Sequence, residues 1–140
     1  MISKTGVHAL RALAVLAALP EGTYGGAAEI AGEIGAPRNY LGKLLKALAD
    51  AGLLESQKGK GGGFRLARSP GRISIFEVID PIEKLSRWSG CFLGHGKCSD
   101  KAPCAVHLQW GKVRDLYLQF LRQTTLADLA SRLPAEMVMA

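Results

Sequence analysis

The chain has 140 residues, of which 48% are hydrophobic and 21% charged. This composition supports a packed core and argues against a disordered chain. The formal net charge of +6 is uneven: residues 1–75 contain ten Lys and Arg against five Asp and Glu, and residues 76–140 contain eight against seven. A basic N-terminal half indicates a polyanionic partner, with nucleic acid the first choice, although a basic domain without such a partner fits the charge equally well.

Nothing in the sequence predicts a membrane span or a signal peptide. The longest apolar run near the N-terminus begins after Arg11 and stops at Pro20, well short of the ~20 residues that cross a bilayer. The start also lacks a basic segment and a small-residue cleavage site. We therefore expect a cytoplasmic protein with no membrane partner, whose cysteines stay reduced.

Apolar residues at helical spacing predict helices at 5–19, 27–34 and about 37–51. The last two are joined by a short turn containing Gly35, which is the layout of a helix-turn-helix. Pro37 is expected in the first turn of the third helix, and Gly52 is expected to close it.

The third helix would read DNA, because the first residues of the second helix in this motif face the major groove. We expect DNA contacts from Arg38, Asn39, Tyr40 and Lys43. Arginine can bind guanine, and asparagine adenine, through two hydrogen bonds. The alternative is an ordinary solvated helix face. Gly42 is an anomaly here, since glycine in a helix interior costs roughly 1 kcal/mol relative to alanine.

A glycine-rich hairpin follows. Strands at 53–57 and 64–68 flank the sequence Lys-Gly-Lys-Gly-Gly-Gly at 58–63, which predicts a wing. A plain surface hairpin is the alternative. The wing tip lacks bulky side chains, so its backbone could lie close to DNA. The expected DNA contacts of this segment are Lys58, Lys60, Gly62 and Arg65.

The second half predicts three further helices. Ser74 and Glu77 form a capping box that starts a helix running toward Trp88. Residues 105–123 predict a long amphipathic helix, whose apolar stripe indicates packing on a second subunit in a homodimer. Thr125 and Asp128 then cap a short helix at 126–133.

All three cysteines lie in the loop at 90–107 between these helices, together with two histidines. Thiolate and imidazole are ligands of soft metals and iron–sulfur clusters. Cys91, Cys98 and Cys104 supply three ligands, and His107 is the best local candidate for the fourth. Alternatives for the fourth ligand are His95, Asp100, a small molecule or the other subunit.

Two other chemistries remain open for this loop. The first is a zinc site, although such sites usually contain closely spaced Cys pairs. The intervals from Cys91 to His107 contain six, five and two residues. A metal-free thiol sensor, oxidised to a disulfide or a sulfenate, is the second.

The order of these features resembles the Rrf2 family of bacterial winged-helix regulators. The residues that carry the resemblance are Pro-Arg-Asn-Tyr-Leu at 37–41, Leu-Lys-Ala-Leu-Ala-Asp-Ala-Gly-Leu-Leu at 45–54, the glycine-rich wing and the three-cysteine loop. The resemblance implies a long helix that crosses to the other subunit of a homodimer. It also implies an iron–sulfur cluster on Cys91, Cys98 and Cys104, with [2Fe-2S] favoured over [4Fe-4S] and His107 at a position where some members use a histidine ligand.

We therefore expect a mainly α fold with a small β-hairpin wing. A winged helix-turn-helix head spans 1–75, with the helix-turn-helix at about 27–51 and the wing at about 53–68. The connecting helix, the cysteine loop (90–107) and the dimerisation helix (about 105–123) occupy 76–140, and one family domain spans about 1–133.

The expected function is an iron–sulfur-dependent regulator of transcription that binds double-stranded operator DNA and senses iron–sulfur, redox or nitric-oxide status. The alternative is a metal-binding or thiol-redox protein whose winged helix mediates protein contacts. An enzyme is not expected, because the sequence contains no nucleophile–base constellation and no nucleotide-binding loop.

Overall fold

The computed structural model describes residues 2–85, 92–93 and 105–132. These residues are mainly helical with one two-stranded sheet, as predicted. The elements are α1 (Lys4–Ala18), α2 (Ala27–Ile34), α3 (Arg38–Asp50), β1 (Leu54–Gln57), β2 (Gly63–Leu66), a 3-10 turn (Pro70–Arg72), α4 (Ile75–Glu83), α5 (His107–Gln123) and α6 (Leu126–Arg132). Within the described ranges no helix has the length and apolarity needed to cross a membrane.

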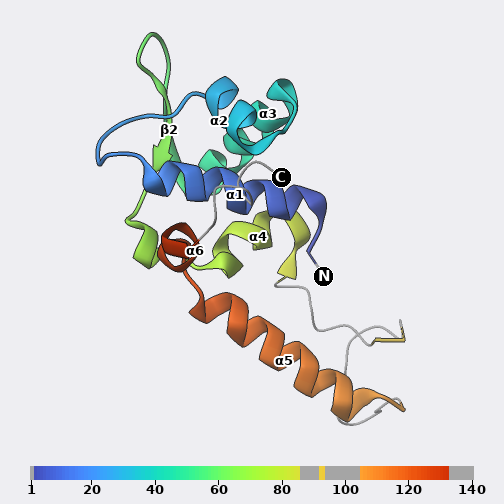
Figure 1. The fold of residues 1–140 in the computed structure, drawn as a ribbon. Coiled ribbons are helices and arrows are strands. Elements are labelled where there is room, and N and C mark those ends of the chain that lie inside the picture. Colours follow the sequence, from blue (N-terminus) through green and yellow to red (C-terminus); the bar gives the residue numbers. More distant parts are fainter. Residues whose placement is uncertain (1, 86–91, 94–104, 133–140) are drawn as a thin grey trace.

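Helix α1 is the centre of the main core, and the other elements of the head are arranged around it (Figure 1). Ala9, Ala12 and Leu13 are fully buried. The small alanines let neighbouring helices approach α1 closely. The apolar faces of α2 and α3 pack into the same cluster, whose largest buried members are Leu13, Ile30, Ile34, Leu41, Leu45, Leu48, Ile73 and Leu126.

The turn between α2 and α3 has the geometry that its sequence favours. Gly35 is left-handed, with φ +71°, and ends α2. Pro37 is the N-cap of α3 rather than a residue of its first turn as predicted, because its backbone is extended (ψ 136°) while its carbonyl accepts the first helical bond from Leu41. Gly52 takes φ +86° just after α3, at the position expected to end the helix.

The wing is an antiparallel hairpin in which Leu54 pairs with Leu66 and Gln57 with Gly63. Gly25 extends it on the other side, since its N–H donates to the carbonyl of Phe64 (2.7 Å) and its carbonyl accepts from the Phe64 N–H (2.8 Å). A side chain at Gly63 would place its Cβ 2.4 Å from the Gly25 oxygen, and the residue has φ +136°. The glycine is therefore required where the two backbones approach.

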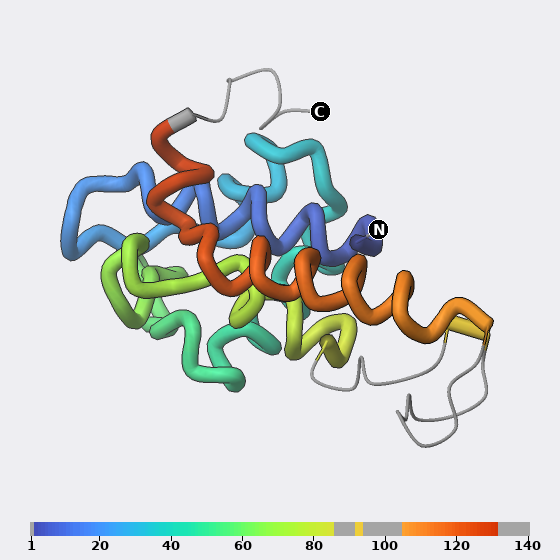
Figure 2. The backbone as a smooth tube through the Cα atoms, turned by 90° about the horizontal axis from the view of Figure 1, so that it is seen from below, coloured from blue at the N-terminus to red at the C-terminus, as the bar shows by residue number. Residues whose placement is uncertain are grey.

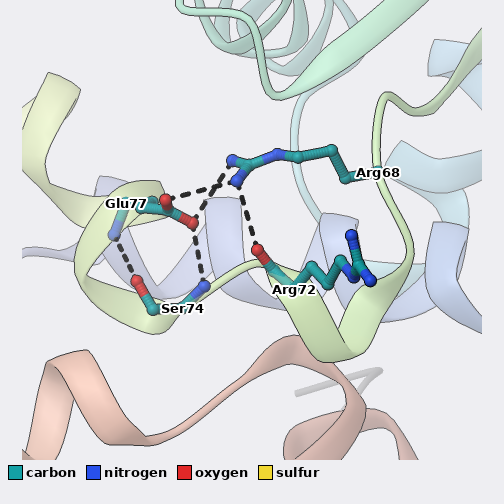
Figure 3. A network of polar contacts seen from close by, with 4 residues as sticks. All are labelled: Arg68, Arg72, Ser74 and Glu77. Atoms are coloured by element: carbon teal, nitrogen blue, oxygen red, sulfur yellow. Dashed lines mark hydrogen bonds and ion pairs between the residues drawn. The ribbon is translucent and has the colours of Figure 1, made fainter.

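The end of the wing is tied to the start of α4 by a polar network (Figure 3). The predicted capping box is confirmed, because Ser74 Oγ accepts from the Glu77 N–H and the Glu77 carboxylate accepts from the Ser74 N–H. Arg68 donates to both Glu77 carboxylate oxygens at 3.3 Å and to the Arg72 carbonyl at 3.2 Å. One carboxylate thus caps α4 and also holds the segment that leaves the wing.

Helix α4 ends at Glu83, because Lys84 takes a left-handed conformation (φ +57°). The prediction that this helix runs toward Trp88 is therefore wrong, since Lys84 and Leu85 are described and lie outside it; residues 86–88 lie outside the described residues. Pro81 is accommodated inside α4, near its C-terminal end.

The chain rejoins the head after α5. The Ile75 N–H donates to the Thr124 carbonyl, and the Leu126 N–H donates to the Ile73 carbonyl, each at 2.9 Å. Helix α6 then packs on α1, with Leu126 fully buried, and Thr125 and Asp128 cap it as predicted. The other end of α5 stands clear of the remaining helices in both views (Figures 1 and 2).

Candidate nucleic-acid interface

One face of α3 is anchored and the opposite face is open. Leu41, Leu45 and Leu48 are fully buried, which fixes the rotation of the helix about its axis. Four of the exposed side chains of the same helix are cationic or carry an amide: Arg38, Asn39, Lys43 and Lys46. Lys46 was not among the predicted contacts, although its spacing of eight residues from Arg38 places both on one side of the helix.

Helices α2 and α3 border a shallow, wide-open hollow of about 730 Å³ along this face. Its lining comes from the start of α2 and the exposed side of α3: Ala27, Ala28, Arg38, Asn39, Gly42, Lys43 and Lys46. Three of these seven residues are cationic. The structure thus brings together three of the four contacts predicted for this helix.

The side chain of the fourth residue, Tyr40, contacts another helix of the head. Its hydroxyl lies 3.1 Å from Nδ1 of His8 in α1, with which it forms a hydrogen bond, and the two rings meet edge to face with centroids 5.4 Å apart. Burial lowers the pKa of His8, and the charges of Lys4 and Arg11 lower it further. The neutral ring therefore anchors the first turn of α3 to α1. The sequence carried no signal for this contact, since the two residues are 32 positions apart.

The hairpin lies on the same side of α1 as α2 and α3 (Figure 1). Lys58 and Lys60 are exposed at its tip. Gly62 has a role in the turn, because a Cβ there would lie 2.2 Å from the Gln57 oxygen. Arg65 is paired across the strands with Glu55 (2.8 Å).

The pairing of Arg65 is reinforced from a second side, since its guanidinium lies 4.8 Å from the centre of the Tyr24 ring. The hydrogen bond to Glu55 raises the pKa of Arg65. The charge of this arginine is thus partly balanced within the wing, unlike the charges at the tip.

The predicted ligands Cys91, Cys98 and Cys104 lie outside the described residues. The fourth, His107, is the first residue of α5 and is half-buried. Three residues further along α5, the ring of Trp110 lies 5.4 Å from the exposed ring of Phe92. Among the residues that the structure describes, no three His, Cys, Asp or Glu side chains gather as a metal site would require.

Helix α5 has two different apolar faces. Leu121 is 2% exposed and packs with Ile75, Ile79 and Leu85 in a second, smaller core. Val113, Leu116 and Phe120 recur at helical spacing on another side and are 58%, 68% and 55% exposed. Exposed apolar side chains gathered on one helix face mark an interaction surface.

A helix-turn-helix followed by a hairpin wing, with cations on the outward face of the second helix, defines the class of winged helix-turn-helix proteins. The chain belongs to the Rrf2 family, described as iron-dependent transcriptional regulators, whose pattern matches residues 2–132. Members of this family are DNA-binding regulators and not enzymes, which confirms the prediction that the chain is not an enzyme.

Individual relatives support this assignment. The chain is 32% identical over 123 residues to the HTH-type transcriptional regulator NsrR of Geobacillus kaustophilus, covering 87% of this chain and 84% of the relative. CymR, the global cysteine regulator of B. subtilis, has a similar structure (TM-score 0.79, 28% identity, 94% of this chain and 96% of that one). IscR of T. potens is also similar (TM-score 0.75, 27% identity, 94% and 86%).

Proposed function

We propose that this protein is a homodimeric regulator of transcription that binds double-stranded operator DNA, and that an iron–sulfur cluster in the loop at 91–107 controls the binding. The observation that carries the DNA-binding part is the outward face of α3. Three cations, Arg38, Lys43 and Lys46, line one hollow there, while the leucines on the opposite face fix the helix against the core.

The contacts divide by chemistry. Arg38 and Asn39, in the first turn of α3, would read base edges in the major groove. Lys43 and the wing lysines Lys58 and Lys60 would neutralise phosphates, which contributes affinity without sequence preference. Tyr40 would act indirectly, because its hydrogen bond with His8 holds the reading end of α3 in place.

The donor set of the loop fits an iron–sulfur cluster. Cys91, Cys98 and Cys104 would supply three thiolates and His107 the fourth ligand, which completes the usual count of four. A bound cluster would supply a centre that responds to iron supply, oxidants or nitric oxide. The description of the family as iron-dependent supports this choice. We favour [2Fe-2S] as the form of the cluster from the resemblance of the cysteine loop alone.

Helix α5 links the loop to the head. It begins at His107, and its far end is anchored by Leu121 and by Arg122, whose guanidinium lies 4.6 Å from the centre of the Phe76 ring in α4. Helix α4 in turn packs on α1. A rearrangement at the start of α5 would therefore reach the DNA-binding head through packed helices. We place the boundary between the DNA-binding head and the sensing part, which contains α4, the cysteine loop and α5, at about residue 75. Helix α6 lies after this boundary in the sequence but packs back on the head.

The exposed face of α5 supports the homodimer. Val113, Leu116 and Phe120 would be covered by a second copy of the same helix, which would place two recognition helices in one assembly. A twofold dimer of this kind reads two half-sites about 34–36 Å apart, so its operator would be palindromic.

The decisive experiment is purification without air, followed by absorption and EPR spectroscopy, iron analysis and gel retardation. We expect a coloured protein whose DNA affinity changes when the cluster is removed. Cys98→Ala should abolish both the colour and this change. A colourless wild type with stoichiometric zinc, or unchanged state-dependent binding in Cys98→Ala, would overturn the cluster proposal.

The fourth ligand is tested separately with a matched pair of histidine variants. His107→Ala should shift the absorption spectrum and destabilise the cluster, whereas His95→Ala should leave both unchanged. The opposite pattern would assign the role to His95.

The similarity to CymR, the global cysteine regulator of B. subtilis, favours one second candidate: a thiol sensor without metal. On that proposal the protein contains no iron, and mild oxidation changes its DNA affinity until a thiol reductant reverses the change. A third outcome, in which no duplex is retarded in any state, would favour a metal-binding protein whose winged helix contacts another protein.

A further inference from the structure

Three side chains form a row across the base of the wing. Arg65 in β2 lies directly opposite Glu55 in β1, whose carboxylate accepts from its Nε at 2.9 Å and lies 2.8 Å from its Nη2. On the other side of β2, Gly25 pairs with Phe64 in an antiparallel bridge. In that register Tyr24 lies opposite Arg65, and the centre of its ring is 4.8 Å from the guanidinium. Arg65 therefore joins β1, β2 and the segment that precedes α2 on one face of the hairpin.

The backbone alone joins the hairpin to this segment at one residue pair. The connection from α1 crosses the base of the hairpin just before α2 begins (Figure 1), and the two hydrogen bonds between Gly25 and Phe64 hold it there. Gly63 lies beside this pair, with φ +136°. Glycine has no Cβ and adopts many backbone conformations, so the crossing by itself fixes the angle of the hairpin weakly. The contact between Arg65 and Tyr24 adds a second attachment at the next register position.

The charge of Arg65 is engaged within the protein, whereas Lys58 and Lys60 are exposed at the tip of the wing. The edge of the guanidinium that carries Nε and Nη2 faces Glu55, and this is the edge that binds an oxyanion through two hydrogen bonds. A phosphate bound there would have to displace the carboxylate. The geometry therefore suits the orientation of the wing better than a contact with DNA.

We propose that Arg65 is a positioning residue and not a phosphate contact: by bridging Glu55 and Tyr24, it fixes the angle between the wing and α2. The proposal rests on the DNA binding proposed above, and it assigns Arg65 a different role from the contact that the sequence predicts. A fixed angle would hold Lys58 and Lys60 in the binding orientation before DNA arrives, so that little affinity is lost in ordering the wing.

The first test needs no DNA. Tyr24→Leu removes the ring without changing the charge, and Arg65→Lys keeps the charge but removes the planar group that reaches both partners. In either variant the amide hydrogens of Gly25 and Phe64 should exchange with solvent about fivefold faster, which corresponds to about 1 kcal/mol for an exposed cation–π contact. Hydrogen exchange followed by NMR measures both rates. Tyr24→Phe is the matched control, because it keeps the ring and should exchange as slowly as the wild type.

The second test is affinity for a duplex that the wild type selects from a random pool, measured over a range of salt concentrations. A loosened wing lowers the fraction of chains in the binding orientation but leaves the contacts of the bound state unchanged. Tyr24→Leu, Arg65→Lys and Arg65→Gln should each weaken binding about two- to fivefold with an unchanged log–log salt slope. Tyr24→Leu combined with Arg65→Lys should bind no more weakly than either single variant, since both break the same contact. Lys58→Ala, which removes a proposed phosphate contact, should instead reduce the slope by about one.

Two results would overturn the inference. A salt slope reduced by about one in Arg65→Gln, together with wild-type affinity in Arg65→Lys, would make Arg65 a phosphate contact. Exchange at Gly25 and Phe64 that is as slow in Tyr24→Leu as in the wild type would show that the ring does not hold the wing. Failure of the wild type to bind any duplex would refute the proposed function and the DNA-binding role of Arg65 with it, while the exchange rates would still decide whether Arg65 fixes the wing.

Discussion

The dimer can be tested by truncating Leu116, because the expected loss follows from its exposure. Leu116→Ala removes three carbons from a side chain that is 68% exposed in the single chain. At about 0.8 kcal/mol per buried carbon, burying the exposed share gives ~1.6 kcal/mol for each subunit. A twofold interface contains the residue twice, so the dimer should lose about 3 kcal/mol, and its dissociation constant should rise about 200-fold.

Sedimentation equilibrium over a range of concentrations measures this constant directly. The matched control is Leu121→Ala on the same helix, because Leu121 is 2% exposed and already buried within its own chain. That variant should lose about 2–5 kcal/mol of folding stability, as expected for a leucine truncated in a core. If Leu116→Ala dimerises as tightly as the wild type, the exposed face of α5 is not the subunit interface.

Three further predictions concern the head. Ser74→Ala removes the N-cap of α4 and should lower the free energy of unfolding by about 1 kcal/mol. Arg68→Ala should lower it less, because an exposed ion pair contributes about 0–1 kcal/mol. Urea unfolding measures both losses. His8 has a lowered pKa in the folded chain, so folding stability should be full above pH 6.5 and fall as the pH drops below that value. His8→Gln should remove the contribution of His8 to this fall in stability. An identical pH profile of stability for both proteins would contradict the lowered pKa of His8. Lys43→Ala should weaken DNA binding on all sequences and reduce the log–log salt slope by about one, whereas the equally exposed Lys112→Ala on α5 should change neither.

The helices of this protein could be predicted because their signals are local. Leucines at helical spacing defined α3, and a serine followed three residues later by glutamate defined the start of α4, as the structure confirms. Gly35 and Gly52 were expected at helix ends and have the left-handed backbones that favour glycine there. Such features depend on residues within one or two turns of each other, so a single sequence contains them in full.

The contacts that position the candidate interface could not be predicted in the same way. The pairing of Gly25 with Phe64, the bond of His8 with Tyr40 and the return of α6 to α1 join residues far apart in the chain. None of these contacts leaves a periodic pattern. The bare wing tip predicts a hairpin turn that can lie close to DNA, with Gly62 as a contact. The sequence carries no signal that Gly62 and Gly63 are also needed for the close approach of the protein's own backbones.

The uneven anchoring of α5 suggests how a small change in the loop would act over a distance. The helix has 17 residues and is therefore about 25 Å long, at about 1.5 Å per residue. Leu121, near its C-terminal end, is its one fully buried residue, while most of the helix before it is more exposed. On the proposed function, the cysteine loop would act on the N-terminal end of α5, which it precedes in the sequence. The head anchors the C-terminal end of the helix through Leu121. Because the exposed apolar face lies between them, a tilt of α5 would change the angle between the two subunits more than the fold of either. Half-site spacing, rather than the shape of each recognition helix, is then the property that the sensor controls.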